Sequence, residues 1–104
     1  LKRDMAATVA QTVGSGAPAR SLPGVEGMSF GEVAVPETYF GRTLGSLDIR
    51  KRFGVSVVLI KRRSLGGDRI VDEMPDANYV FCEGDVMLVM GSTESIERFE
   101  RSGA

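Results

Sequence analysis

The sequence has no histidine, no tryptophan and a single cysteine, Cys82, among its 104 residues. Without histidine, the commonest general base and transition-metal ligand is missing, and one cysteine cannot form a disulfide within the chain. No apolar run approaches the roughly 18 residues of a membrane-spanning helix; the longest of note is Val86–Met90. These absences predict no catalytic residue, no metal site and a reducing compartment, with Cys82 as a buried core thiol.

The net charge is close to zero, at −1, but the charges are unevenly distributed. Segment 42–63 has seven basic residues and one acid, whereas segment 72–100 has eight acids and one base. The two segments could neutralise each other across the fold or across a dimer, or could simply be two solvated faces. Nucleic-acid binding would call for exposed aromatics among the basic residues. Only Phe53 lies there, so we expect no nucleic-acid partner.

The order of the expected elements is β-α-β-β-β-α. Residues 1–13 could form a helix, and the glycine-rich segment 14–31 is typical of a linker. A compact domain is therefore expected to span residues 32–104, with residues 1–31 as a helix remnant and linker. The expected strands are 32–36, 55–60, 69–74 and 86–90, and the helical segments are 43–53 and the residues after 92. This order predicts an α+β fold with a small, mixed, largely antiparallel sheet.

The basic segment is divided by residues with strong local preferences. Thr43 is a good N-cap for a first helical turn, and Asp48 is expected to cap a second. Gly54 fits the left-handed position that ends a helix. The following strand, 55–60, is apolar at nearly every position, which predicts a central strand covered on both faces. Arg50, in the first turn after Asp48, makes this a candidate anion site, because arginine binds phosphate well.

Two stretches, VAVPETYFGRTLGSLDIRKRFGVSVVLIKR and, after an intervening proline, EGDVMLVMGS, resemble a known family. It is the TrkA-C or RCK-C domain, the C-terminal regulatory domain of bacterial potassium-transport proteins. The shared features are a strand ending in proline, Gly-x-Thr-Leu, Leu-Asp-Ile-Arg with Phe-Gly shortly after, an apolar strand, and Gly-Asp before a strand that ends in glycine. The resemblance covers about residues 32–100. A fainter similarity of residues 2–6 to the end of the RCK-N domain, and a start at Leu1 rather than methionine, suggest a piece of a longer protein.

The resemblance implies a homodimer that adjusts a cation channel or transporter, such as a potassium transporter, from the cytoplasmic face of the membrane. Several members bind cyclic di-AMP between two such domains. Carried over to this sequence, the contact positions are Asp48, Ile49, Arg50, Val55 and Ser56. Arg50 would meet a phosphate, Ile49 and Val55 would face adenine, and the backbone at residues 55–56 would bind the base edge. No other cofactor is implied.

Members that bind cyclic di-AMP usually have asparagine where this sequence has Ser56. Asparagine offers a donor and an acceptor to a base edge, whereas serine offers one hydroxyl with less reach. Two alternatives therefore stay open beside a nucleotide sensor. Ile49 and Val55 could be core or dimer contacts in a module that dimerises, or binds a protein, without a small ligand. Asp48 could be a cap only, and Arg50 could pair with an acid of segment 72–100.

Overall fold

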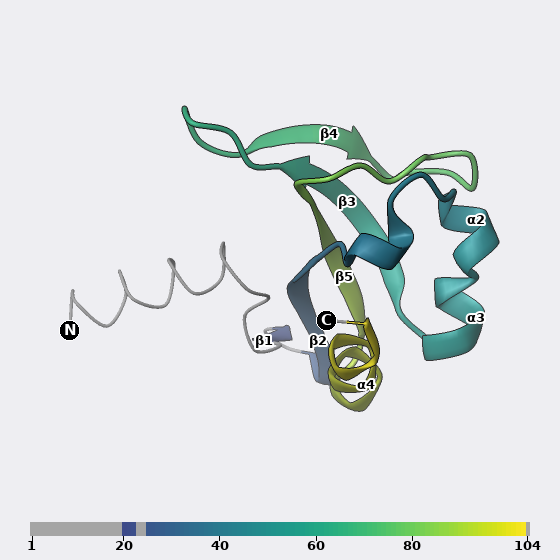
Figure 1. The fold of residues 1–104 in the computed structure, drawn as a ribbon. Coiled ribbons are helices and arrows are strands. Elements are labelled where there is room, and N and C mark those ends of the chain that lie inside the picture. Colours follow the sequence, from purple (N-terminus) through teal and green to yellow (C-terminus); the bar gives the residue numbers. More distant parts are fainter. Residues whose placement is uncertain (1–19, 23–24, 104) are drawn as a thin grey trace.

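The computed structural model describes residues 20–22 and 25–103. They form one antiparallel sheet in the order β1-β2-β5-β3-β4, with the helices lying beside it (Figure 1). The strands are β1 (Arg20–Leu22), β2 (Val25–Ala34), β3 (Ser56–Arg62), β4 (Arg69–Glu73) and β5 (Asp85–Ser92). The helices are the 3₁₀ helix η1 (Glu37–Tyr39) and the α-helices α2 (Leu44–Leu47), α3 (Ile49–Phe53) and α4 (Thr93–Gly103). The predicted α+β class is confirmed.

Strand β5 lies at the centre of the sheet, between β2 and β3. Val89 of β5 is opposite Gly31 on one side and Val57 on the other. Along β2, buried and half-buried residues alternate from Met28 to Ala34, as expected for a strand with one face on the core. Since Val89 is fully buried, the core lies against this face of the central strand.

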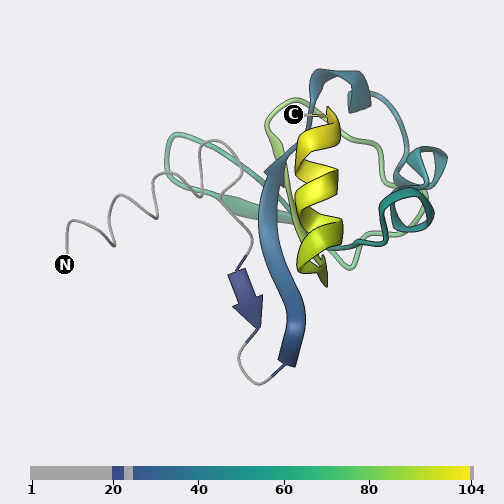
Figure 2. The same ribbon diagram turned by 90° about the horizontal axis from the view of Figure 1, so that it is seen from below.

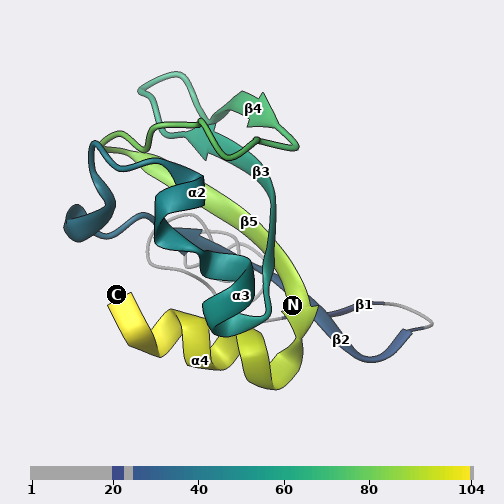
Figure 3. The ribbon, with the colours of Figure 1, turned by 90° about the vertical axis from the view of Figure 1, so that its right-hand side faces the viewer.

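Helices α3 and α4 complete the core. Ile96 and Phe99 of α4 are both buried. Figure 2 shows α4 lying along β2; Figure 3 shows α2 and α3 in front of β5, with α3 next to α4. The Phe53 ring lies 5.1 Å from that of Phe99, centroid to centroid. Aromatic pairs at this spacing stabilise a core beyond their buried area, so α3 is held against α4.

The predicted linker is wrong for the part that the structure describes. Residues 20–22 and 25–31 lie in strands β1 and β2, so the strand that was expected to start at residue 32 starts at Val25. Its partner is more than fifty residues away, since Met28 pairs with Ser92 and Ala34 with Val86. Long-range pairing stabilises a segment whose glycine content is typical of a loop. The expected helix at residues 1–13 lies outside the described residues.

Two predictions about burial are also corrected. Strand β3 is internal, between β5 and β4, but only Ile60 of this strand is fully buried, and Val57, Val58 and Leu59 are half-buried. A single copy of the chain therefore leaves part of β3 uncovered. Cys82 is exposed rather than buried, because it precedes the turn before β5 and its side chain points out of the core.

No helix in the described ranges is long and apolar enough to cross a membrane.

Candidate functional site

Three local signals shape the segment between η1 and β3. The Thr43 hydroxyl accepts a hydrogen bond from the N–H of Ser46 at 3.1 Å, which confirms the predicted N-cap of α2. Gly54 ends α3 with a left-handed backbone at φ 77°, as predicted. Between the two helices, Asp48 is itself left-handed at φ 54° and ψ 41°. The chain therefore makes two short helical turns and enters β3 within a dozen residues.

This segment and the loop after β4 enclose a pocket of about 460 Å³, which we call the β3 pocket. Its walls are mostly apolar, with charge at one end. The apolar and small residues that line it are Leu44, Gly45, Ile49, Val55, Val57, Met74, Pro75 and Ala77. The remaining residues are Asp48, Arg50 and Ser56. An apolar pocket with a few polar groups at its edge is the usual form of a small-molecule site.

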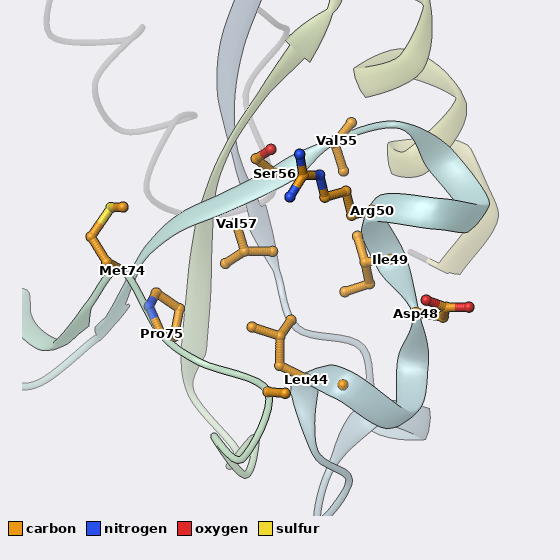
Figure 4. A pocket seen from close by; sticks show the side chains of 11 residues that line it. Leu44, Asp48, Ile49, Arg50, Val55, Ser56, Val57, Met74 and Pro75 are labelled. Carbon is orange, nitrogen blue, oxygen red and sulfur yellow. The ribbon is translucent and has the colours of Figure 1, made fainter.

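The structure brings all five residues singled out from the sequence to the β3 pocket. In Figure 4, Arg50 extends toward Ser56, whereas Asp48 points away from the other labelled side chains. Arg50 and Ser56 are exposed, while Ile49 and Val55 are only 2% and 0% exposed. Arg50 and Ser56 are thus accessible to a ligand, and Ile49 and Val55 belong mainly to the core. The role of all five as ligand contacts stays a prediction.

Asp48 does not act as the predicted side-chain cap. Its carboxylate makes no cap hydrogen bond to α3, because its left-handed backbone joins the two helices and its own N–H donates to the carbonyl of Gly45 at 3.2 Å. Arg50 makes no ion pair within the described ranges, so the alternative in which it pairs with an acid of segment 72–100 is not found there. Its guanidinium remains available at the end of the pocket.

Several lining residues lie outside the predicted set. Leu44 and Val57 line the pocket beside Ile49, and Met74 and Pro75 close its other side (Figure 4). Pro75 could have been found from the sequence, because it is the proline between the two stretches that resemble the family. Met74 had no such signal, because its place depends on the hydrogen bond from its N–H to the carbonyl of Val58, at 2.8 Å.

The only two non-glycine residues with positive φ in the described ranges both line this pocket. They are Asp48, at φ 54°, and Met74, at φ 52°. Aspartate tolerates the left-handed region better than most residues, but methionine is rarely found there. Backbone strain of this kind tends to gather at binding sites, where the surrounding structure holds it in place. The two strained residues therefore add an independent reason to regard the β3 pocket as a functional site.

The basic and acidic segments do neutralise each other at one point. Arg62 Nε donates to Asp85 Oδ1 at 2.8 Å, and the Asp85 side chain is fully buried. Asp85 Oδ2 also accepts hydrogen bonds from the Tyr79 hydroxyl at 2.6 Å and from the N–H of Cys82 at 2.9 Å. Burial, and then the hydrogen bond to Asp85, raise the pKa of Tyr79 far above its ordinary value. This network lies outside the β3 pocket and fixes the turn before β5.

A second cluster joins strands β2 and β3 to the loop that precedes β4. Lys61 lies 2.6 Å from a carboxylate oxygen of Glu32 and 3.1 Å from one of Asp68. Burial lowers the pKa of Lys61, but the hydrogen bonds and charges of these two partners together outweigh it, so the pKa is raised overall. Within the described part of the chain, no group of three or more His, Cys, Asp or Glu residues could hold a metal ion.

Comparison with known families gives one match over most of the chain. The model of the TrkA-C domain matches residues 30–102. The chain belongs to the TrkA-C domain family. The match confirms the resemblance that was drawn from the Gly-Arg-Thr-Leu and Leu-Asp-Ile-Arg stretches, and it starts inside strand β2.

Individual relatives of this TrkA-C domain are parts of potassium transport systems. The Ktr system potassium uptake protein C of Bacillus subtilis (strain 168) is 36% identical over 100 residues, which are 96% of this chain and 43% of that protein. The chain thus spans less than half of this relative's length.

Two solved structures share the fold. The crystal structure of the GsuK RCK domain aligns with a TM-score of 0.62 and 25% identity, over 73% of this chain and 16% of that one. The RCK C domain of the potassium transport protein KtrA, in complex with cyclic di-AMP, aligns with a TM-score of 0.58 and 28% identity. That alignment covers 71% of this chain and 81% of the KtrA domain.

Proposed function

We propose that this TrkA-C domain is the cytosolic regulatory domain of a potassium channel or related cation transporter, and that its β3 pocket binds a nucleotide such as cyclic di-AMP. The observation that carries the proposal is the meeting of Asp48, Ile49, Arg50, Val55 and Ser56 in one pocket. Sequence resemblance alone selected these residues. A cyclic di-AMP complex of a domain with the same fold supports the choice of ligand.

The pocket divides into parts that suit different parts of such a ligand. Arg50, at the charged end, is the natural partner for a phosphodiester, because guanidinium–phosphate hydrogen bonds are charge-assisted. An adenine ring would lie on the apolar wall made by Leu44, Val57 and Pro75. This differs from the assignment of adenine to Ile49 and Val55, which are too deeply buried to present their side chains. Ser56 would then offer its hydroxyl to the base edge.

A second copy of the chain would complete the site. The pocket is open to solvent, and Met74 on its edge is 77% exposed, with Ile70 of β4 54% exposed. Exposed apolar side chains that border a site commonly mark an interface. The half-buried residues of β3 add to the apolar surface there. We infer a homodimer with the ligand held between the two β3 pockets.

Regulation would then work by population shift. A ligand that binds one arrangement of the two domains better than another moves the equilibrium by that difference in affinity. The attached membrane protein would respond to the arrangement, and the domain itself would catalyse no reaction. Light scattering tests the dimer: the chain of 11.2 kDa should give twice that mass at micromolar concentration, and a clean monomer at high concentration would contradict it.

Calorimetry with cyclic di-AMP tests the ligand, with ATP and NADH as comparison nucleotides. We expect cyclic di-AMP alone to bind well, and Arg50→Ala to weaken it about tenfold or more, the effect of losing a charge-assisted hydrogen bond. Lys51→Ala is the matched control, because Lys51 is the exposed basic neighbour that does not line the pocket. Equal affinities for the parent chain and Arg50→Ala would show that the site is misplaced.

A second candidate function is a dimerisation module without a small ligand. The observation that favours it is Ser56, which stands where ligand-binding relatives usually have asparagine. Under this alternative no nucleotide binds the chain, yet the dimer persists in light scattering. Ser56→Asn separates the two hypotheses further. If it creates cyclic di-AMP binding in a chain that otherwise binds none, the pocket is competent but unused in its present form.

A further inference from the structure

A second pocket lies beside the other side of the α2–α3 segment, and we call it the arginine pocket. Its volume is about 270 Å³, and it lies between η1, the α2–α3 segment and the last turn of α4. It shares no lining residue with the β3 pocket. Two arginines, Arg42 and Arg52, line it together with Tyr39 and Phe53. Nothing in the nucleotide proposal above makes use of these residues.

Contacts hold Arg52 in place before any ligand arrives. Its Nη1 donates to the carbonyl of Leu47 at 3.1 Å, and its guanidinium lies over the Phe53 ring, 5.0 Å from the centroid. Stacking on an aromatic face leaves most of the guanidinium N–H groups free to donate. Arg52 is therefore a preorganised donor rather than a flexible surface side chain.

The backbone that carries Arg42 is also fixed. Its N–H donates to the carbonyl of Tyr39 at 3.0 Å, and its carbonyl accepts from the N–H of Phe81 at 3.0 Å. The adjacent N–H, that of Gly41, donates to the carbonyl of Phe81 at 2.9 Å. These three hydrogen bonds fix the backbone at Arg42 to the core. The Arg42 side chain therefore extends to the pocket from a rigid backbone.

Neither arginine has an acidic partner in the part of the chain that the structure describes. Lys61 and Arg62 form ion pairs with acids elsewhere in the fold, and no carboxylate is among the residues that line the arginine pocket. Two guanidinium groups at one pocket repel each other unless an anion lies between them. Both arginines are exposed, so an anion from solution can reach their guanidinium groups.

Tyr39 adds a neutral donor. Tyr39 is 8% exposed as a whole residue, and its hydroxyl makes no hydrogen bond to any described residue. Burial raises the pKa of Tyr39, and the positive charge of Arg52 partly opposes this rise. The Tyr39 hydroxyl therefore stays protonated at neutral pH. It can donate a hydrogen bond to an anion. The hydroxyl of Ser102 already donates to the carbonyl of Phe99 at 2.7 Å, so it is not a further donor.

We propose that the arginine pocket binds a phosphate group, held by the guanidinium groups of Arg42 and Arg52 and by the Tyr39 hydroxyl. Phosphate fits better than a carboxylate, because its oxygens can accept from donors that approach from several directions. The pocket volume of about 270 Å³ leaves room beyond the phosphate itself. The group could belong to inorganic phosphate or to a small phosphomonoester.

Nuclear magnetic resonance of the isotopically labelled 104-residue chain tests the proposal. Inorganic phosphate and glycerol phosphate are titrated separately, against sodium chloride at matched ionic strength. We expect saturable shifts of the amides of Tyr39, Arg42 and Gly103. Tighter binding of glycerol phosphate would identify a phosphomonoester as the ligand, and equal or weaker binding would identify inorganic phosphate.

Variants decide whether the arginine pocket is responsible. Arg42→Gln should weaken phosphate binding at least about fivefold, the usual result of losing one charge-assisted hydrogen bond. Lys51→Gln is the matched control, since it removes an exposed charge beside Arg52 that lines neither pocket. Tyr39→Phe removes the hydroxyl alone and should weaken binding by a smaller factor. Arg50→Gln should leave the phosphate-dependent shifts of Tyr39 and Gly103 unchanged, which separates this site from the nucleotide site.

Three results would overturn the proposal. Shifts that sodium chloride reproduces would indicate screening alone. Equal losses for Arg42→Gln and Lys51→Gln would indicate attraction to net charge. Phosphate shifts centred on Arg50 and Ser56 would place the anion in the β3 pocket, a result that would support the nucleotide site while removing the second one.

Discussion

Replacing Asp85 by alanine tests how the turn before β5 is held. The Asp85 side chain is fully buried and accepts hydrogen bonds from Arg62 at 2.8 Å, from the Tyr79 hydroxyl at 2.6 Å and from the N–H of Cys82 at 2.9 Å. Alanine would leave three donors without their acceptor. The Tyr79 hydroxyl and the N–H of Cys82 are part-buried, so water can replace the carboxylate only incompletely.

The magnitude follows from the character of these contacts. Removing one partner of a buried ion pair typically costs about 3–5 kcal/mol. The Arg62 side chain is 28% exposed, so part of its loss is recovered by solvation, and we expect about 3 kcal/mol for Asp85→Ala. Tyr79→Phe removes a single donor and should cost about 1–2 kcal/mol. The total free energy of unfolding of a small domain is only about 5–15 kcal/mol. The Asp85 variant should therefore be severely destabilised.

Urea unfolding followed by circular dichroism measures both variants, with the midpoint and the slope compared to the parent chain. Glu83→Ala is the matched control, because Glu83 is an exposed acid of the same turn, and it should change the free energy of unfolding by less than about 0.5 kcal/mol. If Asp85→Ala fails to fold, Tyr79→Phe still tests the network. A loss below about 1 kcal/mol for Asp85→Ala would refute this account of the turn.

Two further predictions concern the wall of the β3 pocket and the C-terminal helix. In Gly45→Ala, the new methyl group would lie 2.8 Å from the Cβ of Ala77 and 3.1 Å from its carbonyl oxygen, so thermal unfolding should show a loss of about 1–3 kcal/mol that adding Ala77→Gly partly reverses. No reversal would mean that the clash lies elsewhere. Burial, and then the charge of Glu97, raise the pKa of Glu100, so ionising Glu100 destabilises the fold as the pH rises through that raised pKa. Glu100→Gln should therefore raise the melting temperature relative to the parent more at pH 7 than at pH 4, and an equal effect at both would contradict this.

The features that the sequence predicted correctly depend on nearby residues. Thr43 caps α2 through Ser46, three residues away, and Gly54 ends α3 through its own backbone angles. In each case the conformational preference of one residue and the geometry of one turn are enough to predict where the helix begins or ends.

The features that sequence reasoning missed depend on distant partners. Strand β2 starts at Val25 because β5 pairs with it, and no local pattern outweighed the glycines of that segment. The N–H of Met74 donates a hydrogen bond to the carbonyl of Val58 in strand β3, and this bond holds Met74 at the β3 pocket. The position of Asp48 was predicted but its role was not, because the left-handed backbone that displaces its carboxylate from α3 is set by the two helices together. The arginine pocket forms only where η1, α3 and α4 come together in the fold, so no local stretch of sequence predicts it.

The exposed position of Cys82 has a practical consequence. It is the only thiol of the sequence, it is exposed, and its part in the Asp85 network is through the backbone N–H rather than the side chain. A nitroxide or fluorophore can therefore be attached to the unaltered chain with a single defined product. Two copies would then carry one label each, so the spacing between labels, measured with and without a nucleotide, would report how the two domains rearrange.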